Sequence, residues 1–257
     1  MNRFIAGDTE SVIERLCATM NSIDRKWGEK IKPATKEQIQ RLEDLIGFSE
    51  NGIQIPKVYL DFLEKMGQDD GGLLENEWDG FSEATIEVII DYYNFVHDEE
   101  FDYDAKKLLL FSSHWSEAYL YLDMSKGDNP PVYNSEKLFA DTFEKYLFHM
   151  AFKYMYKKEY QNSDNWLSFS RKQMNDMLKK ATTFNGTMSE RMEYISQIMH
   201  GLSFEKVWFS DSVRNYYYKD GIVVMVSAYF TLGILVVGND DDKVLQVKNH
   251  ITNLFHV

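Results

Sequence analysis

The sequence predicts an α+β fold, because segments with helical periodicity and segments with strand character alternate along one chain. Apolar residues recur at three- and four-residue spacing in residues 9–26, after Thr35 and in residues 140–156. Aliphatic and aromatic residues form short runs instead, such as 108–111 and 222–229. Hydrophobic residues make up 44% of the 257, which is enough for a packed core.

The first helices are marked by residues that suit a helix start. Thr9 or Ser11 can cap the first helix. Thr35 precedes the second, and Gln38 stands at the capping-box position three residues later. Pro56 suits the first turn of a third helix. The remaining elements expected in this part are helices at 83–95 and 140–156, strands at 108–111, 119–122 and 132–133, and an acidic loop or short strand at 68–79.

Residues beyond about 158 read as a second unit. The sequence Lys219-Asp220-Gly221 is a strong signal for a hairpin between two strands. We expect helices at 170–181 and 189–199 with Ser189 as a cap, strands at 205–209, 213–219, 222–229 and 232–237, and a closing helix at 240–255. The predicted domains are therefore an acidic binding domain at 1–157 and an α+β extension at 158–257.

The charge of the protein is concentrated in its first part. The formal net charge is −13. Residues 1–157 hold 17 Lys and Arg against 30 Asp and Glu, whereas residues 158–257 hold 11 of each kind. A negative field of this kind repels nucleic acid and anionic membrane and attracts basic protein partners. Solubility is the simpler explanation of the same charge.

The cellular setting follows from cysteine usage and hydropathy. Cys17 is the single cysteine and lies in the apolar phase of the first helix, so we interpret it as a packing residue. The N-terminal residues carry acids where a signal peptide needs an apolar run. The most apolar stretch, residues 221–238, is rich in β-branched residues and favours a buried hairpin over a membrane span. We therefore expect a cytoplasmic protein without membrane contact.

Catalytic and metal motifs are scarce in the sequence. It contains no CxxC, HExxH, GxSxG or phosphate-loop pattern, and its histidines do not cluster at ligand spacing. Ser113 and His114 could form a base and nucleophile pair, but a turn between two strands is the favoured interpretation. The sequence thus predicts a protein that is not an enzyme and that has no cofactor and no metal.

Two acidic clusters with interleaved aromatic residues are the candidate binding surface. Aromatic anchors add desolvated area to charge attraction, which is typical of recognition surfaces, although solvated loops have the same composition. The first cluster lacks the twelve-residue pattern of a helix–loop–helix calcium site. The residues expected to contact a partner are Asp69, Asp70, Glu75, Glu77, Trp78, Asp79, Asp98, Glu99, Glu100, Phe101, Asp102, Tyr103 and Asp104.

Several short motifs follow one another in a characteristic order between residues 27 and 147. They are Trp27-Gly28, the segment 34–43 (ATKEQIQRLE), the segment 55–63 (IPKVYLDFL), Met66-Gly67, the strand region 108–123, Pro131-Val132-Tyr133 and the segment 141–147 (DTFEKYL). In this order they resemble the SUKH superfamily, which includes fungal cell-wall-synthesis regulators and many bacterial immunity proteins. The resemblance implies an α+β fold with a mixed or antiparallel sheet, helices packed around it, and no shared catalytic residues.

The resemblance also implies a function. Many bacterial members look like immunity proteins that neutralise a toxin, often a nuclease. We therefore expect a non-catalytic protein-binding module, an immunity protein that neutralises a nuclease-type polymorphic toxin through its acidic surface. The expected partner is a basic toxin domain, with no nucleic acid and no membrane; the sequence indicates no oligomeric state. The alternatives are a regulatory scaffold of the fungal type or, less favoured, a hydrolase.

Overall fold

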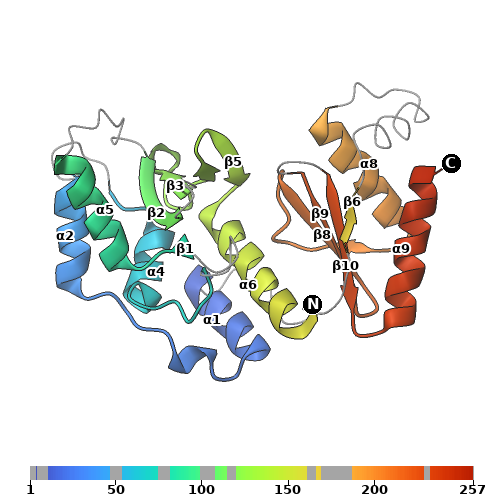
Figure 1. The fold of residues 1–257 in the computed structure, drawn as a ribbon, viewed down its shortest axis with the longest axis horizontal. Coiled ribbons are helices and arrows are strands. Elements are labelled where there is room, and N and C mark those ends of the chain that lie inside the picture. Colours follow the sequence, from blue (N-terminus) through green and yellow to red (C-terminus); the bar gives the residue numbers. More distant parts are fainter. Residues whose placement is uncertain are drawn as a thin grey trace. The chain divides into compact units, whose positions relative to one another are not determined.

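The computed structural model divides into two compact units, Asn2–Met155 and Tyr156–Val257 (Figure 1). It describes residues 4, 11–46, 54–74, 82–98, 108–114, 120–160, 166–168, 187–228 and 232–256. The predicted α+β fold is confirmed, since the described residues form seven α-helices and two antiparallel sheets. The assignment of the two parts as a binding domain and an extension stays a prediction.

The first unit begins with helices and continues with a meander of strands. Its helices are α1 (Val12–Ile23), α2 (Lys36–Ile46), α4 (Lys57–Met66), α5 (Ile86–Asp98) and α6 (Phe143–Tyr160), with short 3₁₀ turns at Trp27–Glu29 and Met124–Lys126. Its strands are β1 (Ser82–Glu83), β2 (Leu108–His114), β3 (Leu120–Asp123), β4 (Val132–Asn134) and β5 (Lys137–Ala140). They pair in the order β1-β2-β3-β4-β5, each antiparallel to its neighbour.

An aromatic cluster joins helices and sheet at the centre of this unit. Phe111 of β2 lies 5.2 Å from Phe143 and 5.3 Å from Tyr146 of α6, measured between ring centroids. Tyr59 of α4 lies 5.5 Å from Phe143 in an edge-to-face arrangement. All four rings are fully buried. Such pairs each add about 1 kcal/mol beyond the burial of area, so this cluster fixes α4 and α6 on the sheet.

The described residues of the second unit pack two helices on one face of a sheet. Its strands are β6 (Trp166–Ser168), β7 (Glu205–Lys206), β8 (Arg214–Lys219), β9 (Ile222–Ser227) and β10 (Gly233–Gly238), in the order β6-β10-β9-β8-β7. Its helices are α8 (Met188–Gly201) and α9 (Asp241–His256). Ile195 of α8 and Ile251 of α9 pack with Val224 and Ile234 of the sheet in one buried cluster. Figure 1 shows both helices on the same side of the strands.

The hairpin predicted at Lys219-Asp220-Gly221 is confirmed. Lys219 pairs with Ile222 across a two-residue turn. Asp220 has φ 48° and Gly221 has φ 85°, so both central residues adopt the left-handed conformation that a tight hairpin turn requires. The turn sets the register of the whole β8–β9 pair.

Several local predictions need correction. The cap of α8 is Thr187 and not Ser189, because Thr187 and Glu190 form a reciprocal capping box that places Ser189 inside the first turn. The strand expected at 205–209 ends at Lys206, because the chain then enters a turn in which the Ser210 amide donates to the Val207 carbonyl. Ser113 and His114 belong to β2 and pair with β1, so the predicted turn at this position is wrong.

Other predictions fall outside the described residues or missed an element. Thr9 and the helix expected at 170–181 lie outside the described part of the chain. Ser11 caps α1 in a capping box with Glu14. The helix expected at 83–95 starts at Ile86, since Glu83 pairs in β1. Strands β1, β5 and β6 were not predicted, because two- to four-residue edge strands carry too few residues for a periodic pattern.

Candidate functional site

The acidic loop after α4 is held by its own carboxylates. Asp70 accepts hydrogen bonds from the backbone amides of Gly72, Leu73 and Leu74 at 2.9 to 3.0 Å. Asp69 accepts one from the amide of Gly71 at 2.9 Å. Both oxygens of Asp70 therefore satisfy loop amides that would otherwise be partly buried without partners. Asp70 acts mainly on the shape of the loop.

Asp69 is placed differently from Asp70. Its main chain pairs with Lys32 in an isolated antiparallel bridge, and the Lys32 ammonium lies 3.9 Å from its carboxylate. The Asp69 side chain is 41% exposed. An exposed ion pair of this length contributes little to stability. Asp69 can therefore present its charge to a partner.

The loop rests directly on a buried tryptophan. Trp27 is fully buried, and Gly71 covers its indole ring. Gly71 has φ +66°, and a Cβ atom at this position would lie only 2.6 Å from the indole nitrogen. Both the backbone conformation and the close approach require glycine here. The contact thus couples Trp27 of the 3₁₀ turn to Gly71 of the acidic loop.

The outer face of α5 presents acids and an aromatic ring. Glu87, Asp91 and Phe95 lie four residues apart on one helix ridge, and all three are exposed. Phe95 is 56% exposed. The charge clusters predicted from the sequence lie before and after α5 and do not include this ridge. The available signal was the helical spacing of Glu87, Asp91 and Phe95.

The inner face of α5 is fixed to its surroundings. Ile86, Ile89 and Ile90 are fully buried. The Tyr93 hydroxyl accepts a hydrogen bond from the amide of Leu110 in β2 at 2.9 Å. Burial raises the pKa of this hydroxyl well above its ordinary value. The buried face of α5 and this hydrogen bond therefore hold the exposed ridge in a fixed position.

Helices α2 and α5 lie side by side and are joined by hydrogen bonds of the Gln38 side chain, which we call the Gln38 clamp. The Gln38 side-chain oxygen accepts hydrogen bonds from the Thr35 amide and from Gln68 at 2.7 and 2.9 Å. The Gln38 amide nitrogen donates to the Glu87 carboxylate. The capping box predicted for Thr35 and Gln38 is confirmed, because the backbone amide of Gln38 donates in return to the Thr35 hydroxyl at 3.2 Å.

Most of the predicted contact residues lie outside the described part of the chain. Asp69 and Asp70 are described, and Asp98 is described as the last residue of α5. The ten that lie outside are Glu75, Glu77, Trp78, Asp79, Glu99, Glu100, Phe101, Asp102, Tyr103 and Asp104. The loop that holds Asp69 and Asp70 follows α4, and the second cluster starts where the α5 ridge ends. Contact by these residues stays a prediction.

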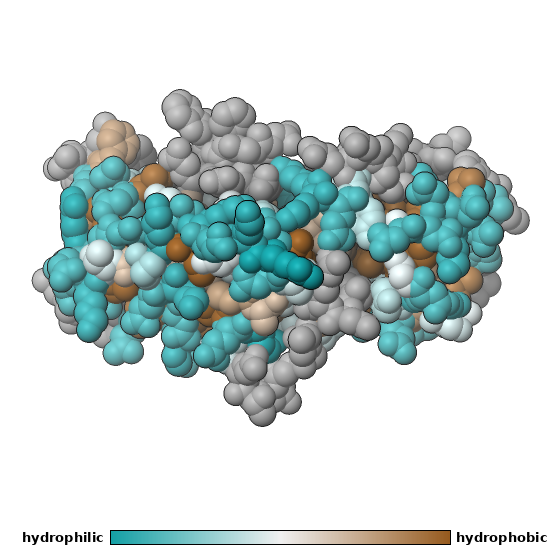
Figure 2. Space-filling view, turned by 90° about the horizontal axis from the view of Figure 1, so that it is seen from below, coloured by the Kyte–Doolittle hydropathy of each residue, from teal (hydrophilic) through white to brown (hydrophobic). Residues whose placement is uncertain are grey.

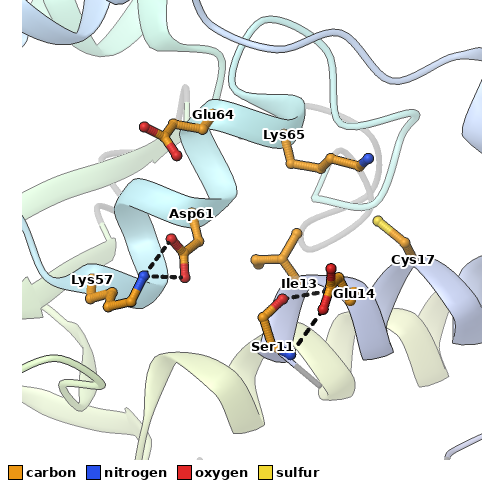
Figure 3. A pocket seen from close by; sticks show the side chains of 8 residues that line it. All are labelled: Ser11, Ile13, Glu14, Cys17, Lys57, Asp61, Glu64 and Lys65. Atoms are coloured by element: carbon orange, nitrogen blue, oxygen red, sulfur yellow. Dashed lines mark hydrogen bonds and ion pairs between the residues drawn. The ribbon is translucent and has the colours of Figure 1, made fainter. Parts of the chain in front are cut away.

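A groove of about 490 Å³ separates α1 from α4 (Figure 3). Its lining is mostly charged and consists of Ser11, Ile13, Glu14, Cys17, Lys57, Asp61, Glu64 and Lys65. Lys57 donates to Asp61 at 2.9 Å, and Ser11 and Glu14 bond each other in the capping box. Lys57, Asp61 and Glu14 are therefore satisfied locally. The groove brings together no pair of an activated nucleophile and a base.

Cys17 faces this groove and is half-buried. Burial raises the pKa of its thiol, and the nearby Lys65 only partly offsets this effect. A raised pKa keeps the thiol protonated near neutral pH, and the protonated thiol is a poor nucleophile. This agrees with the interpretation of Cys17 as a packing residue.

The described residues contain neither a candidate metal site nor a candidate membrane span. Within them, no three His, Cys, Asp or Glu side chains are grouped closely enough to hold a metal ion. No helix in the described part of the chain combines the length and apolarity needed to cross a membrane. Ser113 and His114 are the last two residues of β2. Figure 2 shows one face of the molecule, which is mainly hydrophilic with small, separate apolar patches.

The comparison with known protein families gives one match. The model of the SMI1 / KNR4 family (SUKH-1) matches residues 33–149. The matched segment covers α2 to the first turns of α6, and with them the acidic loop and the α5 ridge. No curated protein and no solved structure matches the chain. The resemblance found in the motifs between residues 27 and 147 is thereby confirmed.

Proposed function

Residues 33–149 match the model of the SMI1 / KNR4 family (SUKH-1), and from this match we propose that the chain is an immunity protein that neutralises a basic, nuclease-type toxin. Proteins of this superfamily are immunity proteins or cell-wall-synthesis regulators, and both act by binding other proteins. The proposed activity is steric and electrostatic blockade of the toxin. It requires no catalytic residue of this chain.

The observation that carries the proposal is the coincidence of charge and domain. The entire net charge of −13 lies in residues 1–157, which contain the matched domain, whereas residues 158–257 are balanced. Solubility alone would not require the charge to be confined to one unit. A nuclease cleft is basic because it binds phosphates, so an inhibitor gains affinity and association rate from an acidic surface.

The proposed contact surface comprises the acidic loop after α4 and the acidic segment after α5. Asp69 supports this assignment because its side chain is partly exposed. Asp98 supports it because it ends the helix whose outer face carries exposed acids. The two clusters thus flank α5 along the chain, within the matched domain.

The test uses the protein encoded by the adjacent open reading frame, purified with its catalytic residue inactivated. Affinity is measured by calorimetry for the wild-type chain and for a variant in which the ten acids of both clusters become Asn or Gln. The control variant neutralises all eleven acids of residues 158–257. We expect the cluster variant to bind about tenfold more weakly or worse, with a reduced salt dependence, and the control to change little.

Two outcomes would contradict different parts of the proposal. Unchanged affinity of the cluster variant overturns the assignment of the surface. Absence of binding by the wild-type chain, together with no protection of cells that express the active toxin, overturns the immunity function.

A regulatory scaffold is the second candidate, favoured by the description of the matched family as SMI1 / KNR4. A scaffold binds signalling partners of the host cell and confers no toxin resistance. Deletion of the gene separates the two functions: toxin sensitivity without a growth defect supports immunity, and a cell-envelope defect without toxin supports regulation.

A further inference from the structure

We infer that the outer face of α5 is a docking surface with Phe95 as its apolar anchor, and that it fits a basic protein surface with an apolar pocket. This inference rests on the proposed function for the class of partner. It goes beyond that proposal by placing the energetic centre of the interface on a helix that the two acidic clusters only flank. The residues that form this face are Glu87, Asp91 and Phe95.

Phe95 stands out among the apolar side chains of the described residues. It is 56% exposed, and Leu245 of α9, at 54%, is the other large hydrophobic residue with this exposure in the described part. A single exposed apolar residue is ordinary by itself. Phe95 is distinguished by its setting, since exposed acids precede it at four-residue spacing on the same helix face, and an aromatic anchor beside polar groups is a common form of interface hot spot.

The charge around Phe95 determines the chemistry of the partner. The α5 sequence, IEVIIDYYNFVHD, contains Glu87, Asp91 and Asp98 and no Lys or Arg. Asp91 is exposed one helical turn before Phe95 on the same ridge. Glu87 is exposed one turn earlier and also accepts a bond from Gln38. A complementary surface therefore places Lys or Arg around the pocket that receives the ring. A nucleic acid is excluded as the occupant because its phosphates repel these carboxylates.

The anchor is held rigidly, which lowers the cost of binding. The opposite face of α5 is buried through Ile86, Ile89 and Ile90. The bond from the Leu110 amide to the Tyr93 hydroxyl fixes α5 to β2, and the Gln38 clamp fixes it to α2. A side chain on such a base loses less conformational freedom on association than one on a mobile segment.

The test measures affinity for the same partner, the inactivated product of the adjacent reading frame, with four single variants. Phe95→Ala removes the anchor, and Leu245→Ala is the matched control because it removes an equally exposed side chain from the charge-balanced unit. Asp91→Asn tests the flanking acid, and Glu64→Gln is its control from the α1–α4 groove. Melting temperatures verify that each variant folds, since the sites are exposed.

We expect Phe95→Ala to weaken binding about 30-fold or more, and Leu245→Ala less than twofold. Asp91→Asn should weaken binding several-fold, mainly through slower association, and Glu64→Gln should leave it unchanged. If the wild-type chain binds and Phe95→Ala changes the affinity no more than Leu245→Ala does, the α5 anchor is overturned while the proposed function stands. If Glu64→Gln weakens binding and Asp91→Asn does not, the groove replaces α5 as the docking surface. If the wild-type chain does not bind, both proposals are overturned.

Discussion

The two units of the chain differ in how they combine charge with packing. In its described residues, the first unit packs five helices with a meander of short strands, and this unit carries the whole acid excess. The described residues of the second unit pack two helices on one face of a sheet whose three central strands have six residues each, and the charges of this unit balance. Both are α+β units with buried aromatic and aliphatic cores. The acidity of the first unit is therefore not a requirement of folding, which leaves solubility or recognition as its purpose.

The polar groups inside the two units differ as well. In the first unit, Arg15 of α1 is 9% exposed and forms an ion pair with Glu144 of α6, and Arg15 also lies 5.8 Å from the centre of the Phe148 ring. Asn129 donates to the other oxygen of Glu144 at 3.1 Å and accepts from its amide at 3.0 Å. In the second unit, the buried carboxylate of Asp211 accepts hydrogen bonds from the nearby backbone amides of Val213 and Arg214.

The largest expected effect comes from breaking the ion pair of the first unit. Glu144→Ala leaves the buried Arg15 guanidinium without its carboxylate, so we expect the free energy of unfolding to fall by about 3 to 5 kcal/mol. The exposed pair of Lys57 and Asp61 supplies the control, and Asp61→Asn should cost less than about 1 kcal/mol. Urea unfolding gives both values. A loss for Glu144→Ala as small as that for Asp61→Asn would show that the pair is not decisive.

A smaller effect is expected from two glycines, one in each unit. Gly71→Ala combines φ +66° with a contact of 2.6 Å to the Trp27 indole nitrogen, so we expect it to cost about 2 to 4 kcal/mol. Gly221→Ala has φ +85° but meets no atom within 4 Å, so only the backbone term of about 1 to 2 kcal/mol applies. Thermal unfolding of both variants measures the difference. Equal destabilisation would contradict the close packing of the acidic loop on Trp27.

The smallest effect concerns the capping boxes, which the two units share. Ser11 caps α1 and Thr187 caps α8, each with a glutamate three residues later. Ser11→Ala and Thr187→Ala should each cost about 1 kcal/mol, because each removes one acceptor for an amide at a helix start. Hydrogen exchange of the first turns checks the two helices separately. A loss in one helix and none in the other would show that the two caps are not equivalent.

Local signals explain which parts of the fold could be predicted. The starts of α2 and α4 follow from Thr35, Gln38 and Pro56, which act on the backbone next to them. The β8–β9 hairpin follows from Asp220-Gly221 for the same reason. The cap of α8 was misplaced, because Thr187 and Ser189 are both plausible caps and only the bond from Glu190 distinguishes them.

The candidate site was less accessible from the sequence. The sequence contains the acidic residues of both clusters but does not separate a carboxylate that shapes a loop from one that is exposed. Asp70 and Asp69 are neighbours of identical type, yet the first binds three amides and the second remains 41% exposed. Phe95 was not identified either, because helical periodicity gives a ridge but the exposure of its ring depends on what the rest of the chain covers.

The sequence by itself determined the α+β class, the order of most elements, the resemblance to the SUKH superfamily and the confinement of the net charge to residues 1–157. These depend on composition and on neighbours within one or two turns of chain, where capping, turn geometry and periodicity act. The tertiary structure alone decided that Gly71 covers Trp27, that Arg15 meets Glu144, and that Phe95 stays exposed. Each of these features depends on residues that are far apart in the chain. Whether such positions are in contact or exposed results from the packing of whole elements.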